Sequence, residues 1–346
     1  MIRSDSRLTE RSPSCPSAPR TPPTLLDHLG PLSIGAPDVH GPLAVFPLFG
    51  PQPRLAYISF AQGLTAGVGI KELDGGASVN DLLVINPGDT SVLLYEGEEV
   101  LGAQQNRTFD VSVLVAAGAQ LRVPVSCVEA GRWDGSRHGE LFAPAPQTAY
   151  PALRRAKNRA AHASVAAGTG PRAMQGEVWD EVASKSARMD VASATGAMHD
   201  MYDDSRNRLD EFSRAIGLRD GQTGALVLVA GRPVVLDHVS RPDVFAALHG
   251  PLVQGYALDA LEASKGEAEP STTIADEFLQ RILGARVSEH DGIGLGRDLR
   301  FAEHRVAGAG LLAGDELIQF TAFPDEPTPG VQERARIRRP SRRRAA

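Results

Sequence analysis

Residues 82–128 read LLVINPGDTSVLLYEGEEVLGAQQNRTFDVSVLVAAGAQLRVPVSCV, and this stretch decides the fold. Short runs of leucine and β-branched residues alternate here with turn signals, among them Asn86-Pro87-Gly88-Asp89 and Glu96-Gly97. No helical period separates the runs, so they predict antiparallel strands over 82–85, 91–95, 111–115 and 121–128. Strands at this spacing favour a sandwich-like or Greek-key arrangement over a parallel sheet.

The flanking sequence adds further elements of both kinds. Apolar runs predict two more strands over 43–49 and 56–60, and Pro47 should confine the first of them to a sheet edge. A segment rich in Ala, Arg and Lys covers 152–168. Apolar residues at steps of three and four then predict an amphipathic helix over 198–216. The remaining expected elements are a helix over 171–189, a hairpin over 224–237, helices from Pro242 and over 272–284, and strands over 299–306 and 317–323.

These elements predict an α+β fold, with an antiparallel, sandwich-like N-terminal part, a helical middle and a further α+β segment, built as one extended domain. The ends are rich in proline and charge and should be disordered. The predicted organisation is a leader over 1–23, a β-rich part over 24–150, a helical segment over 151–218, an α+β part over 219–326 that completes the domain, and an Arg-rich tail over 327–346.

Composition limits the classes of function. The formal net charge is −6, but the leader contributes +2 and the Arg-rich end +6, which leaves the rest near −14. An acidic body argues against nucleic-acid binding, except for a weak, salt-dependent contact by the tail. The only cysteines are Cys15 and Cys127, and no apolar run has the length of a signal peptide core or a membrane span. We therefore expect a cytoplasmic protein with no membrane association.

The densest polar residues lie at the ends of the predicted strands. They are Glu96-Gly97-Glu98-Glu99, Gln104-Gln105-Asn106-Arg107 and the group after the last strand, which includes Glu129, Arg132 and Trp133. A carboxylate among apolar strands needs a partner, and Arg107 and Arg132 are the candidates. A ligand pocket and ion pairs that pin hairpins explain this pattern equally well. The predicted ligand-binding residues are Glu98, Gln105, Asn106, Arg107, Glu129, Arg132 and Trp133.

Several of these strings together resemble one known family. EGEEVLGAQQNR, PVSCVEAGRW, QGEVWDEV, GYALDAL at 255–261 and GAGL at 308–311 occur in the order found in the ARG and rhodanese-phosphatase-superfamily-associated protein domain, an ARPP-type family that is largely uncharacterised. The resemblance covers about Val45 to Phe323. The family name records association with ADP-ribosylglycohydrolase and phosphatase partners, so the resemblance implies a role in nucleotide or ADP-ribose metabolism. It supplies no catalytic residues.

Evidence for catalysis in the residues themselves is weak. Glu98 and Glu129 are the candidates for a general base, and Cys127 could be a nucleophile if a cation lowers its pKa, although a lone cysteine in a strand is usually a small buried hydrophobe. The histidines show no zinc-ligand spacing, and the glycines at 292–296 lack the P-loop pattern. No metal site is predicted, and no cofactor is indicated.

Three functions are compatible with this sequence. The leading interpretation is a cytosolic domain that binds a small molecule of nucleotide or ADP-ribose type and acts beside a partner enzyme. The alternatives are a hydrolase with a buried glutamate as general base, and a structural or interaction module without a ligand. The sequence leaves open both enzymatic activity and a partner protein.

Overall fold

The computed structural model describes residues 25–51, 53–263 and 270–325. The described residues form an α+β fold, which confirms the predicted class. The predicted disordered leader over 1–23 and the Arg-rich tail over 327–346 lie outside the described residues. Cys15 also lies outside the described part of the chain.

A nine-stranded antiparallel sheet forms one side of the molecule. Its strand order is β1-β3-β13-β14-β18-β17-β16-β15, and β2 also pairs with β3. The chain therefore leaves this sheet after β3 and returns to the neighbouring position only at β13. The strands are β1 (Ser33–Ile34), β2 (Asp38–His40), β3 (Leu43–Phe49), β13 (Gly224–Val229), β14 (Arg232–Val239), β15 (Ser288–Asp291), β16 (Arg297–Glu303), β17 (Val306–Ala313) and β18 (Glu316–Pro324).

Two smaller sheets, of three and six strands, are built from the segment between β3 and the helices. Their orders are β10-β7-β4 and β12-β8-β9-β11-β6-β5. Both contribute side chains to one shared apolar core, which is the arrangement that a sandwich predicts. The strands are β4 (Tyr57–Ser59), β5 (Gly69–Lys71), β6 (Asp81–Ile85), β7 (Ser91–Leu94), β8 (Glu98–Leu101), β9 (Arg107–Phe109), β10 (Val113–Val115), β11 (Gln120–Cys127) and β12 (Ala143–Thr148).

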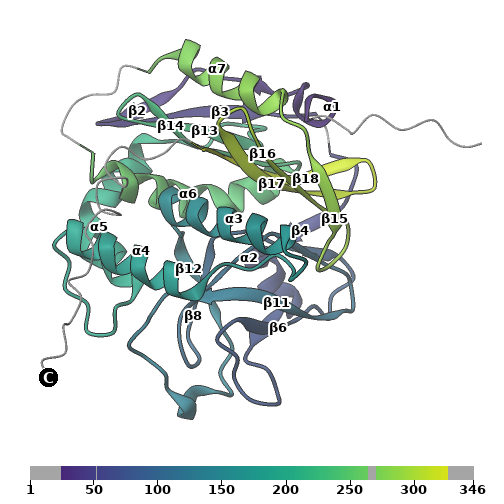
Figure 1. Cartoon of the computed structure of the whole chain (residues 1–346), viewed down its shortest axis with the longest axis vertical. Coiled ribbons are helices and arrows are strands. Elements are labelled where there is room, and N and C mark those ends of the chain that lie inside the picture. The colour runs from purple at the N-terminus through teal and green to yellow at the C-terminus, as the bar shows by residue number, and fades with distance from the viewer. Residues whose placement is uncertain (1–24, 52, 264–269, 326–346) are drawn as a thin grey trace, which may run out of the picture.

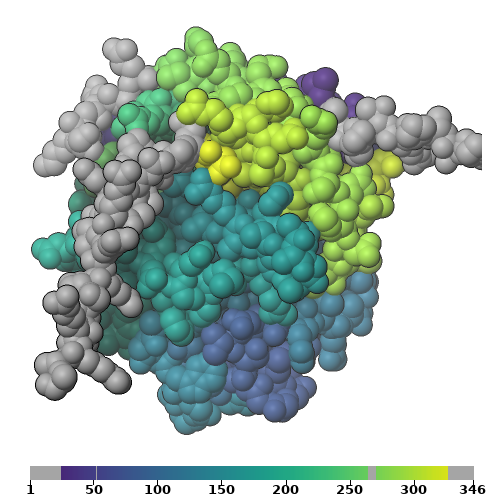
Figure 2. Space-filling model, viewed as in Figure 1, coloured from purple at the N-terminus to yellow at the C-terminus, as the bar shows by residue number. Residues whose placement is uncertain are grey.

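Helices separate the large sheet from the smaller ones (Figure 1). One helix, α7, covers the outer face of the large sheet, and α3 to α6 lie beneath the inner face. The space-filling view shows teal residues in a middle band between green and yellow residues above and blue residues below (Figure 2). The helices are α1 (Leu26–Leu29), α2 (Phe60–Gly63), α3 (Pro151–Ala166), α4 (Gln175–Arg188), α5 (Met198–Ala215), α6 (Pro242–Ala260) and α7 (Thr272–Leu283), with short 3-10 turns η1 (Leu64–Ala66) and η2 (Gly135–Arg137).

The prediction that Pro47 holds its strand at a sheet edge is wrong. β3 lies between β13 on one side and the two short strands β1 and β2 on the other. Thr223 and Ala230 donate to the carbonyls of Leu48 and Pro42, so residue 47 faces the opposite side. There β2 pairs with residues 43–45 and β1 with residues 48–49. The missing N–H of Pro47 therefore falls in the gap between two strands, where no ladder bond is lost.

Local signals predicted several helices well. The amphipathic helix α5 buries its apolar stripe in the main core, and Ser271 caps α7 through a hydrogen bond from the Ile274 N–H. The strand predicted over 299–306 exists as β16, but it ends at Glu303, because the chain reverses at His304 and Arg305 between β16 and β17. Both of these residues have positive φ.

Within the described residues, no helix combines the length and apolar character needed to cross a bilayer.

Candidate functional site

The strand pairing of β9 with β11 brings two of the predicted polar segments together. Arg107 lies opposite Cys127 in the register, so the loop before β9 and the loop after β11 are neighbours. Six of the seven predicted residues meet here: Gln105, Asn106, Arg107, Glu129, Arg132 and Trp133. We call this group, together with Glu72 and Cys127, the strand-end cluster.

One half of the strand-end cluster is a fully engaged ion pair. Arg132 lies 2.6 Å from Glu129 Oε2 and also donates to Ala103 O (2.7 Å) and Asn106 Oδ1 (2.9 Å). The other oxygen of Glu129 accepts from Thr195 Oγ1 at 2.9 Å. Burial alone raises the pKa of Glu129, but these donors outweigh burial and lower it below its ordinary value. Glu129 is thus held ionised, with both oxygens occupied.

Replacing Arg132 with alanine should lower the free energy of unfolding by about 3 kcal/mol, because it leaves the buried carboxylate of Glu129 without its cation. Chemical denaturation of the two proteins measures this difference. Arg137→Ala is the matched control, since Arg137 pairs with Glu140 at the same i,i+3 spacing but both side chains are exposed, at 38% and 48%. That control should cost less than about 1 kcal/mol. Equal effects of the two substitutions would contradict the role given to Arg132.

The other half of the cluster holds hydrogen-bonding capacity that no described residue uses. Arg107 and Glu72 are completely buried and 3.7 Å apart. Nη1 of Arg107 donates to Gln105 Oε1 (3.1 Å), but Nε and Nη2 have no hydrogen-bond partner among the described residues. The carboxylate of Glu72 is in ion-pair contact with Arg107, but neither of its oxygens accepts a hydrogen bond of ordinary geometry from a described residue, and Gln104 Oε1 accepts none either. Donors and acceptors thus lie side by side, unsatisfied and out of contact with solvent.

Cys127 occupies this half of the cluster as a thiol. Its Sγ donates to Gln105 Oε1 at 2.6 Å, and Nη1 of Arg107 lies 3.5 Å from the sulfur. Burial raises the pKa of Cys127, and the nearby guanidinium opposes this only in part. The geometry therefore describes a packed, protonated cysteine rather than an activated thiolate.

Trp133 connects the buried pair to the surface. Its ring lies 5.7 Å from the guanidinium carbon of Arg107, yet half of its own surface is exposed.

The backbone of the cluster is strained at Ala103. The carbonyl of Ala103 accepts a hydrogen bond from Arg132, and its φ is +42°, a value that residues other than glycine rarely adopt. Local strain of this kind is found where surrounding contacts fix a loop for function.

Glu98, the seventh predicted residue, is not part of the strand-end cluster. Its carboxylate accepts from the Tyr95 N–H at 2.7 Å and braces the turn between β7 and β8. Burial raises the pKa of Glu98 to about 7. The adjacent Glu99 is buried on β8, accepts from Gln147 Nε2 at 2.7 Å, and has its pKa raised by burial to about 8. Sequence reasoning had not singled out Glu99 as a site residue.

A second buried charge network lies at the junction of the sheets. Two basic residues of α3, Arg154 and Lys157, are buried. Arg154 donates to Asp237 Oδ2 (2.9 Å) and to Glu96 Oε1 (2.9 Å from Nε). Tyr95 and Tyr256 each donate to Asp237 at 2.6 Å. This network joins the turn after β7, helices α3 and α6, and strand β14.

The sequence did not single out Glu72 of the strand-end cluster as a site residue, nor Gln104 and Gln175, which adjoin the cluster. Gln175, at the start of α4, donates to Cys127 O and accepts from Cys127 N, both at 2.8 Å, and so continues the sheet like one more strand residue. Its only signal was its place in the QGEVWDEV string. Glu72 follows a short apolar run, and nothing local marked it as buried. In the described part of the chain, no group of three or more His, Cys, Asp or Glu side chains could hold a metal ion.

Comparison with known proteins gives one match. Residues 31–323 match the family model described as the ARG and Rhodanese-Phosphatase-superfamily-associated Protein domain. This range includes both the strand-end cluster and the Arg154 network. No curated protein and no solved structure matches the chain.

Proposed function

We propose that this chain, which belongs to the ARG and Rhodanese-Phosphatase-superfamily-associated Protein family, binds a small ligand with a nucleobase, of nucleotide or ADP-ribose type, at Arg107 and Glu72. The observation that carries the proposal is the unsatisfied pair itself. A buried polar group without a partner costs about 1–3 kcal/mol, and a charged group costs more. The opposite charges of Arg107 and Glu72 compensate each other only in part, because their atoms are 3.7 Å apart and form no hydrogen bond to each other. A ligand with complementary hydrogen bonds would offset the remaining free-energy cost.

The arrangement of the free atoms favours a planar, polar edge as the partner. Arg107 offers N–H donors, and Glu72 and Gln104 offer acceptors beside them. The edge of a nucleobase presents donors and acceptors in the same way, and its faces stack on aromatic rings. Trp133 provides a half-exposed ring next to the guanidinium of Arg107. This ring would have to shift to admit the base. The acidic body favours a single nucleotide over a polynucleotide.

The geometry favours binding over hydrolysis. Both oxygens of Glu129 already accept hydrogen bonds, and Cys127 is a thiol bonded to Gln105, so neither side chain is free to attack or to remove a proton. The purely structural alternative accounts for the Glu129–Arg132 half of the cluster. It does not account for the unused hydrogen-bonding capacity of Arg107 and Glu72.

Tryptophan fluorescence during titration with ADP-ribose, AMP and GMP tests the proposal, with ribose 5-phosphate as the ligand that lacks a base. At least one of the base-containing ligands should bind and ribose 5-phosphate should not. Saturable binding of ribose 5-phosphate with equal affinity, or no binding of any of the nucleotides at millimolar concentration, would refute nucleobase recognition.

Replacing Trp133 with alanine should weaken nucleotide binding roughly 5- to 150-fold, since stacking of a base on an aromatic ring is worth about 1–3 kcal/mol. Calorimetry measures the affinity without relying on the tryptophan signal. Stability should change little, because half of the side chain is exposed. Leu141→Ala is the matched control: Leu141 is 63% exposed in the same connection between β11 and β12, and its loss should leave the affinity unchanged.

A further inference from the structure

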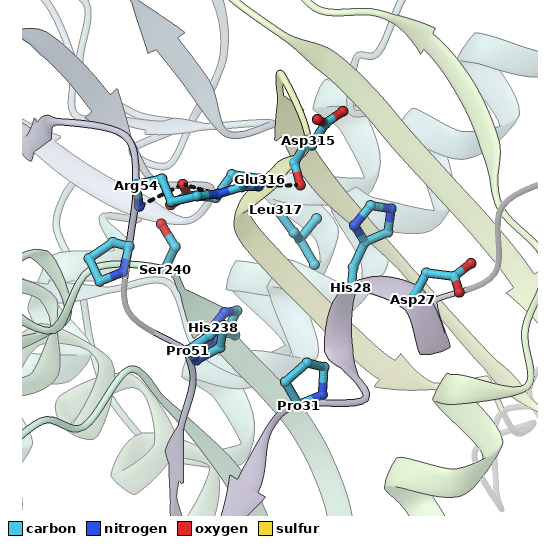
Figure 3. A pocket seen from close by; sticks show the side chains of 11 residues that line it. Asp27, His28, Pro31, Pro51, Arg54, His238, Ser240, Asp315, Glu316 and Leu317 are labelled. Atoms are coloured by element: carbon cyan, nitrogen blue, oxygen red, sulfur yellow. Dashed lines mark hydrogen bonds and ion pairs between the residues drawn. The ribbon is translucent and has the colours of Figure 1, made fainter.

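We propose that a cavity at the ends of two central strands of the large sheet, β14 and β18, binds a small organic ligand that carries a protonated amine. The cavity has a volume of about 300 Å³ and lies between α1, the connection from β3 to β4, the end of β14 and the turn from β17 to β18 (Figure 3). It is remote in the chain from the strand-end cluster and shares no residue with it. Its polar lining consists of Asp27, His28, Arg54, His238, Ser240, Asp315 and Glu316.

Glu316 supplies an acceptor that the described residues leave unused. Its Oε2 accepts from the backbone N–H groups of Arg54 (2.8 Å) and Leu55 (3.0 Å), which fixes the orientation of the carboxylate. Its Oε1 is buried and has no hydrogen-bond partner among the described residues. The side chain of Arg54 is 67% exposed, its Nε lies 3.9 Å from Oε2, and its Nη2 donates to Asp315 O at 3.1 Å. A ligand N–H that reached Oε1 would complete this carboxylate.

His238 adds a second unused polar atom, a ring nitrogen, to the wall of the cavity. It is 4% exposed, and its Nδ1 has no hydrogen-bond partner in the described residues. Burial lowers the pKa of His238 to about 4, so the ring is neutral at neutral pH and does not repel a cation. Two residues further on, directly after β14, Ser240 Oγ lies 2.9 Å from Tyr57 Oη.

The charge and shape of the cavity select the class of ligand. Three carboxylates and one guanidinium line it, which gives a net charge near −2 if the histidines are neutral. Pro31, Pro51, Pro53 and Leu317 form the apolar part of the wall. An ammonium group attached to a short apolar body matches both parts: the ammonium donates to Glu316, and the body packs against the prolines. An anion would meet the carboxylates and be repelled.

Calorimetric titration of the full chain with benzylamine, and with benzyl alcohol as its uncharged counterpart, tests this site. Benzylamine should bind and benzyl alcohol should bind much more weakly. Glu316→Gln should weaken benzylamine binding roughly 10- to 150-fold, since a hydrogen bond to a charged group is worth about 1.5–3 kcal/mol. Asp74→Asn, which removes an exposed acid from the connection between β5 and β6, should leave it unchanged.

Asp315→Asn keeps the test valid if Glu316→Gln perturbs folding, because Asp315 is exposed at the rim of the cavity. It should weaken binding by a smaller factor, and the difference from the native chain should fade at high salt, since salt screens exposed charges. Equal binding of benzylamine and benzyl alcohol, no saturable binding of benzylamine, or native affinity in both variants would overturn the proposal. None of these results bears on nucleotide binding at Arg107.

Discussion

Replacing Arg154 with methionine is expected to lower the free energy of unfolding by roughly 3–5 kcal/mol, measured by urea denaturation. Arg154 is completely buried and holds two carboxylates, Glu96 and Asp237, in the interior of the molecule. Methionine retains much of the side-chain volume but leaves both acids without a cation. An unpaired buried carboxylate must either be protonated or lose its hydration without compensation, and both are costly.

Arg159→Met is the control from the same helix. Arg159 pairs with Asp325, but these side chains are 46% and 35% exposed, so its loss should cost less than about 1 kcal/mol. A triple variant, Arg154→Met with Glu96→Gln and Asp237→Asn, should recover part of the stability because it removes the uncompensated charges. Similar losses in the Arg154 and Arg159 variants, or no recovery in the triple variant, would contradict the assignment of the network.

The pH dependence of stability should carry a large contribution from Glu98 and Glu99. Burial raises their pKa values to about 7 and about 8, from an ordinary value of 4.5. The folded state therefore binds these protons more tightly than the unfolded state. Their contribution to stability is fully present below pH 4.5 and is lost as the pH rises toward about 8. At about 1.4 kcal/mol for each pKa unit, the two groups together should cost several kcal/mol at alkaline pH.

Urea denaturation at mildly acidic and mildly alkaline pH measures this loss. Glu98→Gln and Glu99→Gln each remove one titrating group while keeping the shape of the side chain, so each variant should lose less stability than the native chain as the pH rises. Other groups, such as Glu129 with its lowered pKa, change stability in the opposite direction with pH. The difference between each variant and the native chain isolates the glutamate. Identical pH profiles in all three proteins would show that these carboxyls titrate normally.

Local sequence signals predicted the elements whose character is set by near neighbours. The stripe of α5 and the runs that became β6, β7 and β11 follow from spacing within a few residues. Helix α3 lies within the predicted helical segment over 151–218, but its own bounds were not predicted, because its Ala-, Arg- and Lys-rich sequence carries only a faint apolar stripe. Its buried face carries Arg154 and Lys157, whose hydrogen-bond partners are distant in the chain.

The candidate site was predicted where strand ends could be read from the sequence. Gln105 to Arg107 and Glu129 to Trp133 came together because β9 and β11 pair as neighbours. Glu98 was misplaced in the pocket, because proximity along the chain does not reveal that its carboxylate turns back to Tyr95. The partnership of Arg107 with Glu72 spans 35 positions, and that of Arg154 with Asp237 spans 83. No periodicity identifies such pairs, because only the three-dimensional path of the chain brings them together.

The interrupted large sheet has a consequence for synthesis on the ribosome. β3 needs β13 as its neighbour, yet Gly224 follows Phe49 by 175 positions. At about 5–20 residues per second, translation takes roughly 9–35 s to bridge that distance. During this interval the apolar strand LAVFPLF has only the short β1 and β2 as partners, on one side. The smaller sheets can complete their own pairing first, because their strands lie entirely within residues 57–148. During synthesis, β3, which is buried in the folded protein, thus stays partly unpaired while the two smaller sheets fold.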